Sequence, residues 1–418
     1  MHDQNIAVQE PINDGSVMRG WLAYVIVGVM VSLQFALQGS VSLMVPELKA
    51  DLGLDEAGVG MISSLFFYPY VLLQVPSGRL LSKWGVKTLL VTAGIVMLAG
   101  CLLQSVADSV VTMILGRLIM GIGAAPMIVC FLGTIEHFFV ASVFGALAAS
   151  MEMFGLMGAG IGDFLIPQSI ANWGWRSTLQ IFGVLTLIPI ILAPLVLSNR
   201  QTLAVINEGE IQDWKSVFRD TRIWIFALYS GLMFAVLNAF AALWGIPFLE
   251  ADPACTGHAG QMVGMTFLGA AIGAPTQGWL ADHGMNMRRA MVICAILTIM
   301  LFLAVVSRAL PASFNYLLLF VLGFCSSAYV LPFVMVKHWL TGESLSVGLA
   351  LTNGVSVMVG TLFYQPIIGW LISLYPQADA NSYCQVLMII PFGVALGIVL
   401  IQGARSRTEQ VVPVQSEP

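Results

Sequence analysis

The sequence predicts an all-α membrane protein with twelve transmembrane helices in two six-helix repeats. Of the 418 residues, 58% are hydrophobic and 9% are charged, whereas about 25% of the residues of an ordinary soluble domain are charged. Apolar segments of about 20 residues, the length that crosses a bilayer as a helix, recur along the chain. The runs of about ten residues with alternating polarity that mark a membrane barrel are not seen. The predicted spans are 21–46, 57–78, 87–107, 110–134, 141–168, 176–198, 221–249, 259–281, 288–309, 311–336, 344–373 and 385–404.

Positive charge is concentrated on one side of the predicted bundle. Twelve spans put both termini on the same side, and that side receives all of the 17 lysines and arginines except four. The opposite loops hold Lys49, Arg176 and Arg308, and Arg117 lies inside a span. Because cytoplasmic loops carry the excess of Lys and Arg, both termini are expected in the cytoplasm, with the chain in a bacterial inner membrane. The acidic first 18 residues lack the pattern of a signal peptide.

The two halves of the chain repeat each other. "GRLLSKWGVK" at 78–87 lies between spans two and three, and "GWLADHGMNMRR" at 278–289 lies 200 residues further on, between spans eight and nine. A charged stretch separates the halves and reads as a linker. The expected organisation is a tail at 1–18, a six-helix bundle at 19–198, a linker at 199–220, a second bundle at 221–404 and a tail at 405–418.

These two loops resemble the signature loop of the major facilitator superfamily, and the resemblance covers essentially the whole chain. It implies two parallel six-helix halves with a substrate held between them at mid-bilayer. In the first loop Ser82 stands where the family has an aspartate of its cytoplasmic interlock. In span five, Ala159 stands where the family's antiporter signature has proline, which disfavours efflux by antiport. The residues expected to act in gating are Gly78, Arg79, Gly85, Lys87, Gly278, Asp282, Arg288 and Arg289.

Two carboxylates lie inside span five, in "SMEMFGLMGAGIGDF". Glu152 falls near the middle of the span, and Asp163, eleven residues later, returns to within about 20° of the same helix face. Arg117 falls near the depth of Asp163, which predicts an ion pair that either locks helices or contacts substrate. Glu152 is then unpaired at mid-bilayer, where an ionised side chain costs roughly 2.5–3.5 kcal/mol or more. We therefore expect Glu152 to carry a coupling proton; the alternative is a permanently protonated structural acid.

Other polar and aromatic residues of the spans predict an uncharged, hydrogen-bonding cavity between the halves. Each of them could instead bridge two helices. As a set they suit a small polar or zwitterionic solute. The predicted cavity residues are Gln34, Gln38, Phe67, Tyr70, Gln74, Asn238, Asn353, Ser356 and Tyr364.

Two of the six cysteines, Cys255 and Cys384, fall in loops on the predicted external side. Oxidation is permitted there, so the sequence leaves open a disulfide or two unpaired thiols. The five histidines are scattered, and no cluster predicts a metal site, an enzyme active site or a cofactor other than a proton. No basic patch predicts nucleic-acid binding, so the expected partners are a small solute and membrane lipid, with the chain a monomer.

The expected function is secondary transport of an amino acid, dipeptide or nucleoside by proton symport through Glu152. Through "YQPIIGW" at 364–370 and the carboxylate of span five, the chain resembles importers of amino acids and nucleosides from phagosomal bacteria. The lysosomal dipeptide transporter is a more distant resemblance. Proton-coupled multidrug efflux by antiport, and facilitated uniport with a structural Glu152, remain as alternatives.

Overall fold

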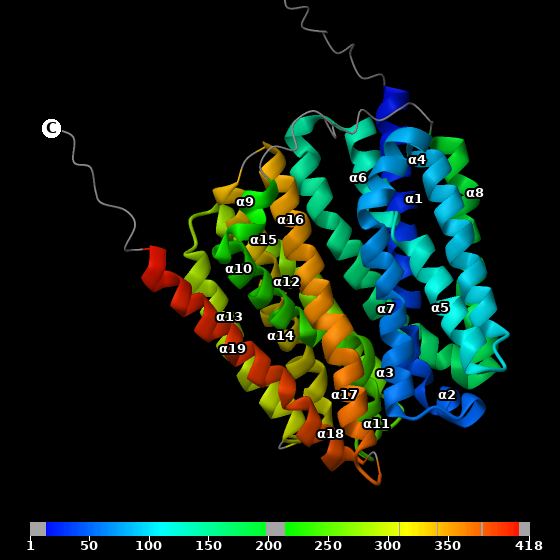
Figure 1. Cartoon of the computed structure of the whole chain (residues 1–418). Helices are drawn as coiled ribbons and strands as arrows, with labels where there is room; N and C mark the ends of the chain where they lie inside the picture. Colours follow the sequence, from blue (N-terminus) through cyan, green and yellow to red (C-terminus); the bar gives the residue numbers. More distant parts are fainter. Residues whose placement is uncertain (1–13, 198–213, 309, 341, 378, 409–418) are drawn as a thin grey trace, which may run out of the picture.

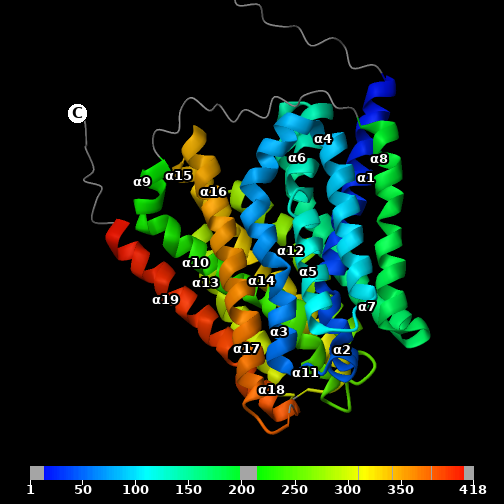
Figure 2. The same ribbon diagram turned by 45° about the vertical axis from the view of Figure 1, so that its right-hand side comes forward.

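Two helical bundles lie side by side in the structure, a computed structural model that describes residues 14–197, 214–308, 310–340, 342–377 and 379–408. The N-terminal bundle occupies the right of Figure 1 and the C-terminal bundle the left. Every regular element of the described residues is a helix, which confirms the predicted fold class. The start of α1 and the end of α19 mark one end of the molecule, called here the terminal end, and α2, α11 and α18 mark the opposite end (Figures 1 and 2).

The N-terminal bundle extends from α1 to α8. Its elements are α1 (Asp14–Gly39), η1 (Ser40–Met44), α2 (Val45–Leu52), α3 (Glu56–Leu65), α4 (Phe67–Ser105), α5 (Val110–Ala124), α6 (Met127–Phe138), α7 (Ala141–Leu185) and α8 (Leu187–Val196). Two of these helices are broken at a glycine, α4 at Gly85 (φ 75°) and α7 at Gly174 (φ 76°). Only glycine adopts such angles readily, so each of these glycines ends one membrane-crossing segment and begins the next.

The C-terminal bundle extends from α9 to α19. Its elements are α9 (Trp214–Arg219), α10 (Thr221–Ala235), η2 (Val236–Trp244), α11 (Gly245–Glu250), α12 (Ala259–Asp282), α13 (Met287–Val306), η3 (Ala312–Phe314), α14 (Asn315–Ser326), η4 (Ser327–Val330), α15 (Leu331–Trp339), α16 (Gly342–Val357), η5 (Met358–Phe363), α17 (Tyr364–Ser373), α18 (Ala380–Leu387) and α19 (Ile389–Thr408). The segments η2 and η5 are π-helices, which are rare and frequently lie at functional sites.

Ten helical segments of the described residues are long and apolar enough to cross a membrane. One of them, Ser150–Val196, contains the break at Gly174 and therefore holds two crossings. The 24-residue α12 runs between the other helices of its bundle and supplies a further crossing. The structure is thus consistent with twelve crossings, and the chain is a multi-pass membrane protein.

Glycines bring helices within each bundle into backbone contact. A side chain at Gly155 would meet the ring of Phe35, and one at Gly158 would overlap the carbonyl of Ser32, both residues of α1. In the C-terminal bundle, a side chain at Gly269 of α12 would overlap the backbone of Phe320 in α14. Lipid tails are as apolar as leucine, so such close van der Waals packing is a main source of helix association in a bilayer.

The two bundles contact each other most closely toward the opposite end. There α7 packs on α12, and α3 packs on α17. A Cβ at Gly160 would lie 3.1 Å from the carbonyl oxygen of Gly264, and a Cβ at Gly60 would lie 2.7 Å from that of Gln365. Backbones therefore touch across the boundary, and this end of the interface is closed.

Helix boundaries differ slightly from the predicted organisation. The first helix starts at Asp14, inside the predicted tail of 1–18, and α19 continues to Thr408, inside the predicted tail of 405–418. The short α9 lies within the predicted linker of 199–220. The remaining parts of the tails and the linker lie outside the described residues.

Candidate functional site

A hydrogen bond between a carboxylate and a tyrosine joins the two bundles near mid-depth. The hydroxyl of Tyr329, in η4, donates to Oε1 of Glu152, in α7. Tyr329 is itself held in place, because its carbonyl accepts a hydrogen bond from Ser230 at 2.8 Å and its ring centroid lies 4.5 Å from that of Phe234. Glu152 is half-buried and lies at the boundary between the bundles, the location expected of a coupling residue.

Aromatic residues of α4 lie near this carboxylate. Tyr70 is close enough to Glu152 for the two to interact electrostatically. The Tyr70 ring stacks on Phe66 with centroids 5.8 Å apart, and Phe67 packs edge-on against both rings. The Glu152 carboxylate therefore has two phenols near it, Tyr70 of the N-terminal bundle and Tyr329 of the C-terminal bundle.

A second polar contact crosses the boundary between the bundles. Nδ2 of Asn353, in α16, donates to Oε1 of Gln74, in α4, at 3.4 Å. Nε2 of Gln74 has no hydrogen-bond partner although it is buried. Buried polar groups are usually satisfied; Tyr70 lies near enough to interact with this side chain, but no group meets Nε2 with hydrogen-bond geometry.

The predicted ion pair between Arg117 and Asp163 is wrong. The guanidinium of Arg117 donates to the carbonyl oxygens of Leu37 at 3.3 Å and Gln38 at 2.5 Å. Its carbon atom Cζ lies 5.2 Å from the ring centroid of Phe66. These carbonyls end α1, where a helix has orphan acceptors and a partial negative charge, so the helix end takes the place of the carboxylate. Counting residues gave the depth of Arg117 but not which neighbouring helix it faces.

Asp163 is left without that partner. Its side chain is 4% exposed, and Oδ2 accepts no hydrogen bond from any described group. It lies where α7 packs on α12: a Cβ at Gly264 would be 3.2 Å from the Cβ of Asp163, and a Cβ at Gly260 would be 2.8 Å from its carbonyl oxygen.

Several predicted cavity residues bond locally. Gln34 donates to Gln38 at 3.3 Å within α1. In the C-terminal bundle, the Ser356 hydroxyl bonds the carbonyl of Thr352 at 2.6 Å, in its own helix. The main-chain carbonyl of Asn238 accepts a bond of 2.6 Å from Gln365. The shared cavity for these residues stays a prediction.

Tyr364 faces away from the boundary between the bundles, contrary to the prediction. Its hydroxyl lies against Gly393 of α19 and donates to the carbonyl of Ile389 at 3.4 Å. The π-helix η5 separates Tyr364 from Asn353. A π-turn contains more residues than an α-turn, so a face projected with α-helical spacing is rotated beyond η5.

Each signature loop contains a glycine with positive φ. Gly85, seven residues after Gly78, has φ of 75°, and Gly284, six residues after Gly278, has φ of 84°, values that suit glycine. In the second loop, Asn286 caps α13 by accepting from the backbone N–H of Arg289 at 3.0 Å. The guanidinium of Arg288 lies 6.0 Å from the ring centroid of Phe226.

For the remaining residues of these loops we describe only where they lie along the helices. Gly78 lies in α4, and a side chain at Gly278 in α12 would meet nothing within 4 Å. Arg79 and Lys87 flank the turn of the first loop on α4. The Asp282 side chain lies outside the described residues, so its gating role stays a prediction.

The predicted disulfide is not formed. Cys255 and Cys384 are both free. The Cys255 sulfur accepts from Nδ2 of Asn315 at 3.4 Å, and the Cys384 thiol donates to the carbonyl of Val306 at 3.1 Å. Each thiol therefore has its own partner on a different helix.

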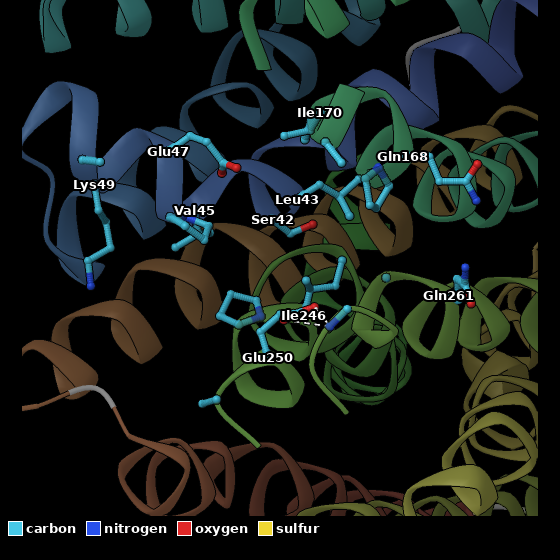
Figure 3. A pocket seen from close by; sticks show the side chains of 18 of the residues that line it. Ser42, Leu43, Val45, Glu47, Lys49, Gln168, Ile170, Ile246, Glu250 and Gln261 are labelled. Carbon is cyan, nitrogen blue, oxygen red and sulfur yellow. Dashed lines mark hydrogen bonds between the residues drawn. The ribbon is translucent and has the colours of Figure 1, made fainter. Parts of the chain in front are cut away.

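A cavity of about 970 Å³ lies at the opposite end of the molecule, between the bundles (Figure 3). No predicted cavity residue lines it. Its charged lining is Glu47, Lys49, Glu56 and Glu250. Lys49 forms an ion pair with Glu56, and Glu250 accepts from the N–H of Gly257 at 3.1 and 3.2 Å. The charged run "PELKADLGLDE" at 46–56 was the sequence signal available for this cavity. Tyr329 had no such signal, because it lies in an apolar stretch.

No group of three or more His, Cys, Asp or Glu among the described residues could hold a metal ion. The arrangement is instead one of polar contacts between two bundles, with one end closed by backbone contacts. These features define a multi-pass membrane protein built from two bundles that meet through polar and backbone contacts.

Comparison with known proteins identifies the family. The family model described as Major Facilitator Superfamily matches residues 21–251, more than half of the chain, so this chain belongs to the major facilitator superfamily. It is 26% identical over 284 residues to a probable L-galactonate transporter of Escherichia coli strain K12, with 62% of each chain covered. It is 24% identical over 270 residues to a nitrite extrusion protein of Bacillus subtilis strain 168, with 62% of this chain and 65% of the relative covered. The chain thus spans less than two thirds of the length of these relatives.

Solved structures with little sequence identity share the fold. A mutant of the nucleoside transporter NupG matches with a TM-score of 0.76 at 15% identity, covering 91% of this chain and 99% of the other. A bacterial homologue of the human lysosomal transporter Spinster, described as inward-facing and occupied, matches with a TM-score of 0.77 at 12% identity, covering 92% and 97%. At such identities the likeness shows the fold alone.

Proposed function

We propose that this transporter is a proton-coupled symporter for a small polar solute that carries a carboxylate, such as an amino acid or a sugar acid. The observation that carries the proposal is the hydrogen bond from Tyr329 to Glu152. The carboxylate belongs to one bundle and accepts a hydrogen bond from the other at mid-depth. Its contact therefore depends both on whether a proton is bound and on the relative position of the bundles.

The proton role follows from the cost of intramembrane charge. An acid inside a bundle marks a substrate or proton pathway more often than a structural contact. In the described residues Glu152 has no cationic partner within 4 Å. Its bond with Tyr329 must change when the bundles rock apart, which links protonation to alternating access.

The solute class is inferred from the polar groups near Glu152 and from the relatives. The free amide donor of Gln74 and the phenols of Tyr70 and Tyr329 offer hydrogen bonds without a strong charge. By their names, the two curated relatives carry small anions, L-galactonate and nitrite. A sugar acid with one carboxylate, accompanied by one proton, crosses the membrane with no net charge, whereas a zwitterionic amino acid with one proton carries one positive charge. The sugar acid therefore suits Glu152, which has no cationic partner among the described residues.

The same proposal includes the orientation and organisation expected from the sequence. The terminal end faces the cytoplasm of a bacterial inner membrane, because the Lys and Arg excess lies there. The chain works as a monomer of two bundles joined by the linker, with a proton as its coupling ion.

Transport by purified protein in liposomes tests the proposal. Radiolabelled amino acids, sugar acids, dipeptides, nucleosides and small inorganic anions would be screened with and without an inward proton gradient. Glu152→Gln should lose at least about tenfold in gradient-driven accumulation while keeping counterflow exchange, because exchange needs no net proton movement. Asp108→Asn is the matched control, since that acid is 94% exposed and should leave both activities unchanged.

The other outcomes are informative. Accumulation that is unchanged in Glu152→Gln would contradict proton coupling through this residue and favour uniport with a structural acid. Extrusion of lipophilic cations without uptake of any polar solute would replace symport by drug antiport.

A further inference from the structure

Asp163 is a buried acid to which the proposed transport cycle gives no role. The side chain is 4% exposed and its Oδ2 has no hydrogen-bond partner among the described residues. An ionised carboxylate in this state would be strongly destabilising, since buried charges need a partner. The surroundings therefore accommodate the neutral acid, with its proton on the carboxyl group.

The position of Asp163 connects it with the closed end of the boundary between the bundles. Gly264 and Gly260 of α12 press against Asp163 from the other bundle. Phe164 and Pro167, beside Asp163 on α7, line the cavity at the opposite end, and so does Gly260. Separation of α7 from α12 would open a path from this cavity to Asp163 and expose it to water.

Few charged groups lie where they could stabilise an ionised Asp163 in place of its proton. Within α12 there is no titratable residue until Asp282 at its far end, and η1 has none. His258, the N-cap of α12, lies two residues before Gly260 and is exposed. On α1, Gln34 and Gln38 are uncharged, and Arg19 and Tyr24 lie toward the terminal end. On α5, the two terminal nitrogens of Arg117 bond the carbonyls that end α1, and its Nε has no hydrogen-bond partner among the described residues.

The other neighbours of α7 meet it away from Asp163. On α4, the Cys101 thiol donates to the carbonyl of Leu179, beyond the break at Gly174. On α6, Glu136 and His137 lie in the last turn, at the terminal end. On α7 itself the nearest acid is Glu152, eleven residues away, which is about 16 Å along a helix that rises 1.5 Å per residue. That is too far for direct proton transfer, so the two acids bind protons separately.

We propose that Asp163 is a second proton-binding residue, loaded from the cavity at the opposite end, and that its protonation allows α7 and α12 to close. When this end opens, water reaches Asp163 and the residue can release its proton and ionise. Closure then requires the proton to return, because the contact offers a carboxylate no donor or cation. This inference rests on the proposed proton symport and assigns the closing of one gate to a second acid.

The distance across the opposite end reports directly on this closure. Spin labels on unnatural amino acids at Asn172 and Gln377, two exposed residues of different bundles at that end, leave the native cysteines intact. Pulsed electron paramagnetic resonance on the full chain in lipid nanodiscs would give the distance distribution between pH 5 and pH 9. In the otherwise unmodified protein, the short-distance population should grow as the pH falls.

Asp163→Asn is the decisive variant, because asparagine is similar in size and cannot ionise. It should show the short distance at every pH, whereas Asp108→Asn should behave as the unmodified protein. Retention of the full pH-dependent shift in Asp163→Asn would overturn the proposal, as would a shift of that variant toward the long distance. Monodisperse elution of each variant establishes that it is folded.

Chemical labelling gives a second test that needs no variant. A lipophilic carbodiimide reacts with protonated carboxyl groups in apolar surroundings, and peptide mass spectrometry would locate its adducts. Labelling of Asp163 should be at least about fivefold greater at pH 6 than at pH 9, and equal labelling at both values would contradict the proposal.

If Glu152→Gln leaves transport unchanged but Asp163→Asn abolishes the distance shift, the proposed symport through Glu152 fails while the gating role of Asp163 stands. Conversely, if Glu152→Gln loses gradient-driven accumulation but Asp163→Asn keeps the distance shift, the symport through Glu152 stands and the gating role of Asp163 fails.

Discussion

The hydroxyl of Tyr329 donates a hydrogen bond to the carboxylate of Glu152, and these residues belong to different bundles. An acid whose partner lies across the moving boundary differs from one buried within a single bundle. Its contact exists in one arrangement of the bundles and is lost in another. Proton binding at Glu152 can therefore change the relative stability of the two arrangements, which is what coupling requires.

Loss of the Tyr329 hydroxyl should impair coupled transport. A hydrogen bond to a charged group contributes about 1.5–3 kcal/mol, so Tyr329→Phe should lower the kcat/KM of gradient-driven uptake by roughly 10- to 100-fold. Tyr316→Phe is the matched control, because that tyrosine bonds Gln261 at 3.2 Å inside the C-terminal bundle. The double variant Glu152→Gln/Tyr329→Phe should be no worse than Glu152→Gln alone, and additive losses would show that the two side chains act independently.

Close helix packing at Gly158 should be essential for stability. A Cβ there would overlap the backbone of Ser32, which cannot rotate away as a side chain can. Overpacking costs about 1–3 kcal/mol, so Gly158→Ala should lower the thermal midpoint in detergent by several degrees. Gly354→Ala is the control: a Cβ there meets nothing within 4 Å, and alanine favours a helix by about 0.5–1 kcal/mol. Equal midpoints for the two variants would rule out the packing argument.

The fold was predictable because each span carries its own signal in apolar length and charge placement. The bundle organisation was inferred from the spacing of the repeated loops, and each loop has a glycine with positive φ, Gly85 and Gly284. Close packing of α7 on α1 could likewise be predicted, since Gly155 and Gly158 lie on one helix face. These features depend on local sequence or on simple periodicity.

The partners of the polar groups were less predictable. Depth along the bilayer suggested Asp163 for Arg117, yet the carbonyls of Leu37 and Gln38 compete for the same cation and leave no trace in the sequence. Tyr364 was misplaced because a π-helix breaks the α-helical period. Which helix faces which is decided by packing between distant segments, and a single sequence does not contain that information.

Acid should weaken the start of α10. The carboxylate of Asp220 accepts from the backbone N–H of Arg222 at 2.9 Å and pairs with its guanidinium at 2.7 Å. These hydrogen bonds hold the pKa of Asp220 below its ordinary value of 3.8. The contribution of this cap to stability is therefore complete above about pH 4 and is lost as the pH falls through the lowered pKa.

Replacing this cap should cost about 0.5–2 kcal/mol near neutral pH. Thermal unfolding would be followed for Asp220→Ala and the unmodified protein at pH 7 and at pH 3. The difference between them should be smaller at pH 3, because the unfolded chain takes up a proton below the ordinary pKa of 3.8 and the folded carboxylate does so only below its lowered pKa. Asp108→Asn serves as the exposed control, and a difference that does not depend on pH would show that the carboxylate charge has no part in the cap.

The thiols of Cys255 and Cys384 should both be free in the isolated protein. Unfolding in denaturant without reductant and labelling with maleimide should add six adducts, the number of cysteines in the chain, because each of the two sulfurs bonds a different helix. Four adducts before reduction and six after would establish a disulfide.

In the folded protein Cys255 should react slowly at pH 7, since it is 1% exposed and burial, with the charge of Asp252 nearby, raises its pKa. Only the thiolate reacts, so the rate should rise as the pH is raised toward 9, and rapid labelling of Cys255 at pH 7 would mean that the loop opens more than its packing indicates.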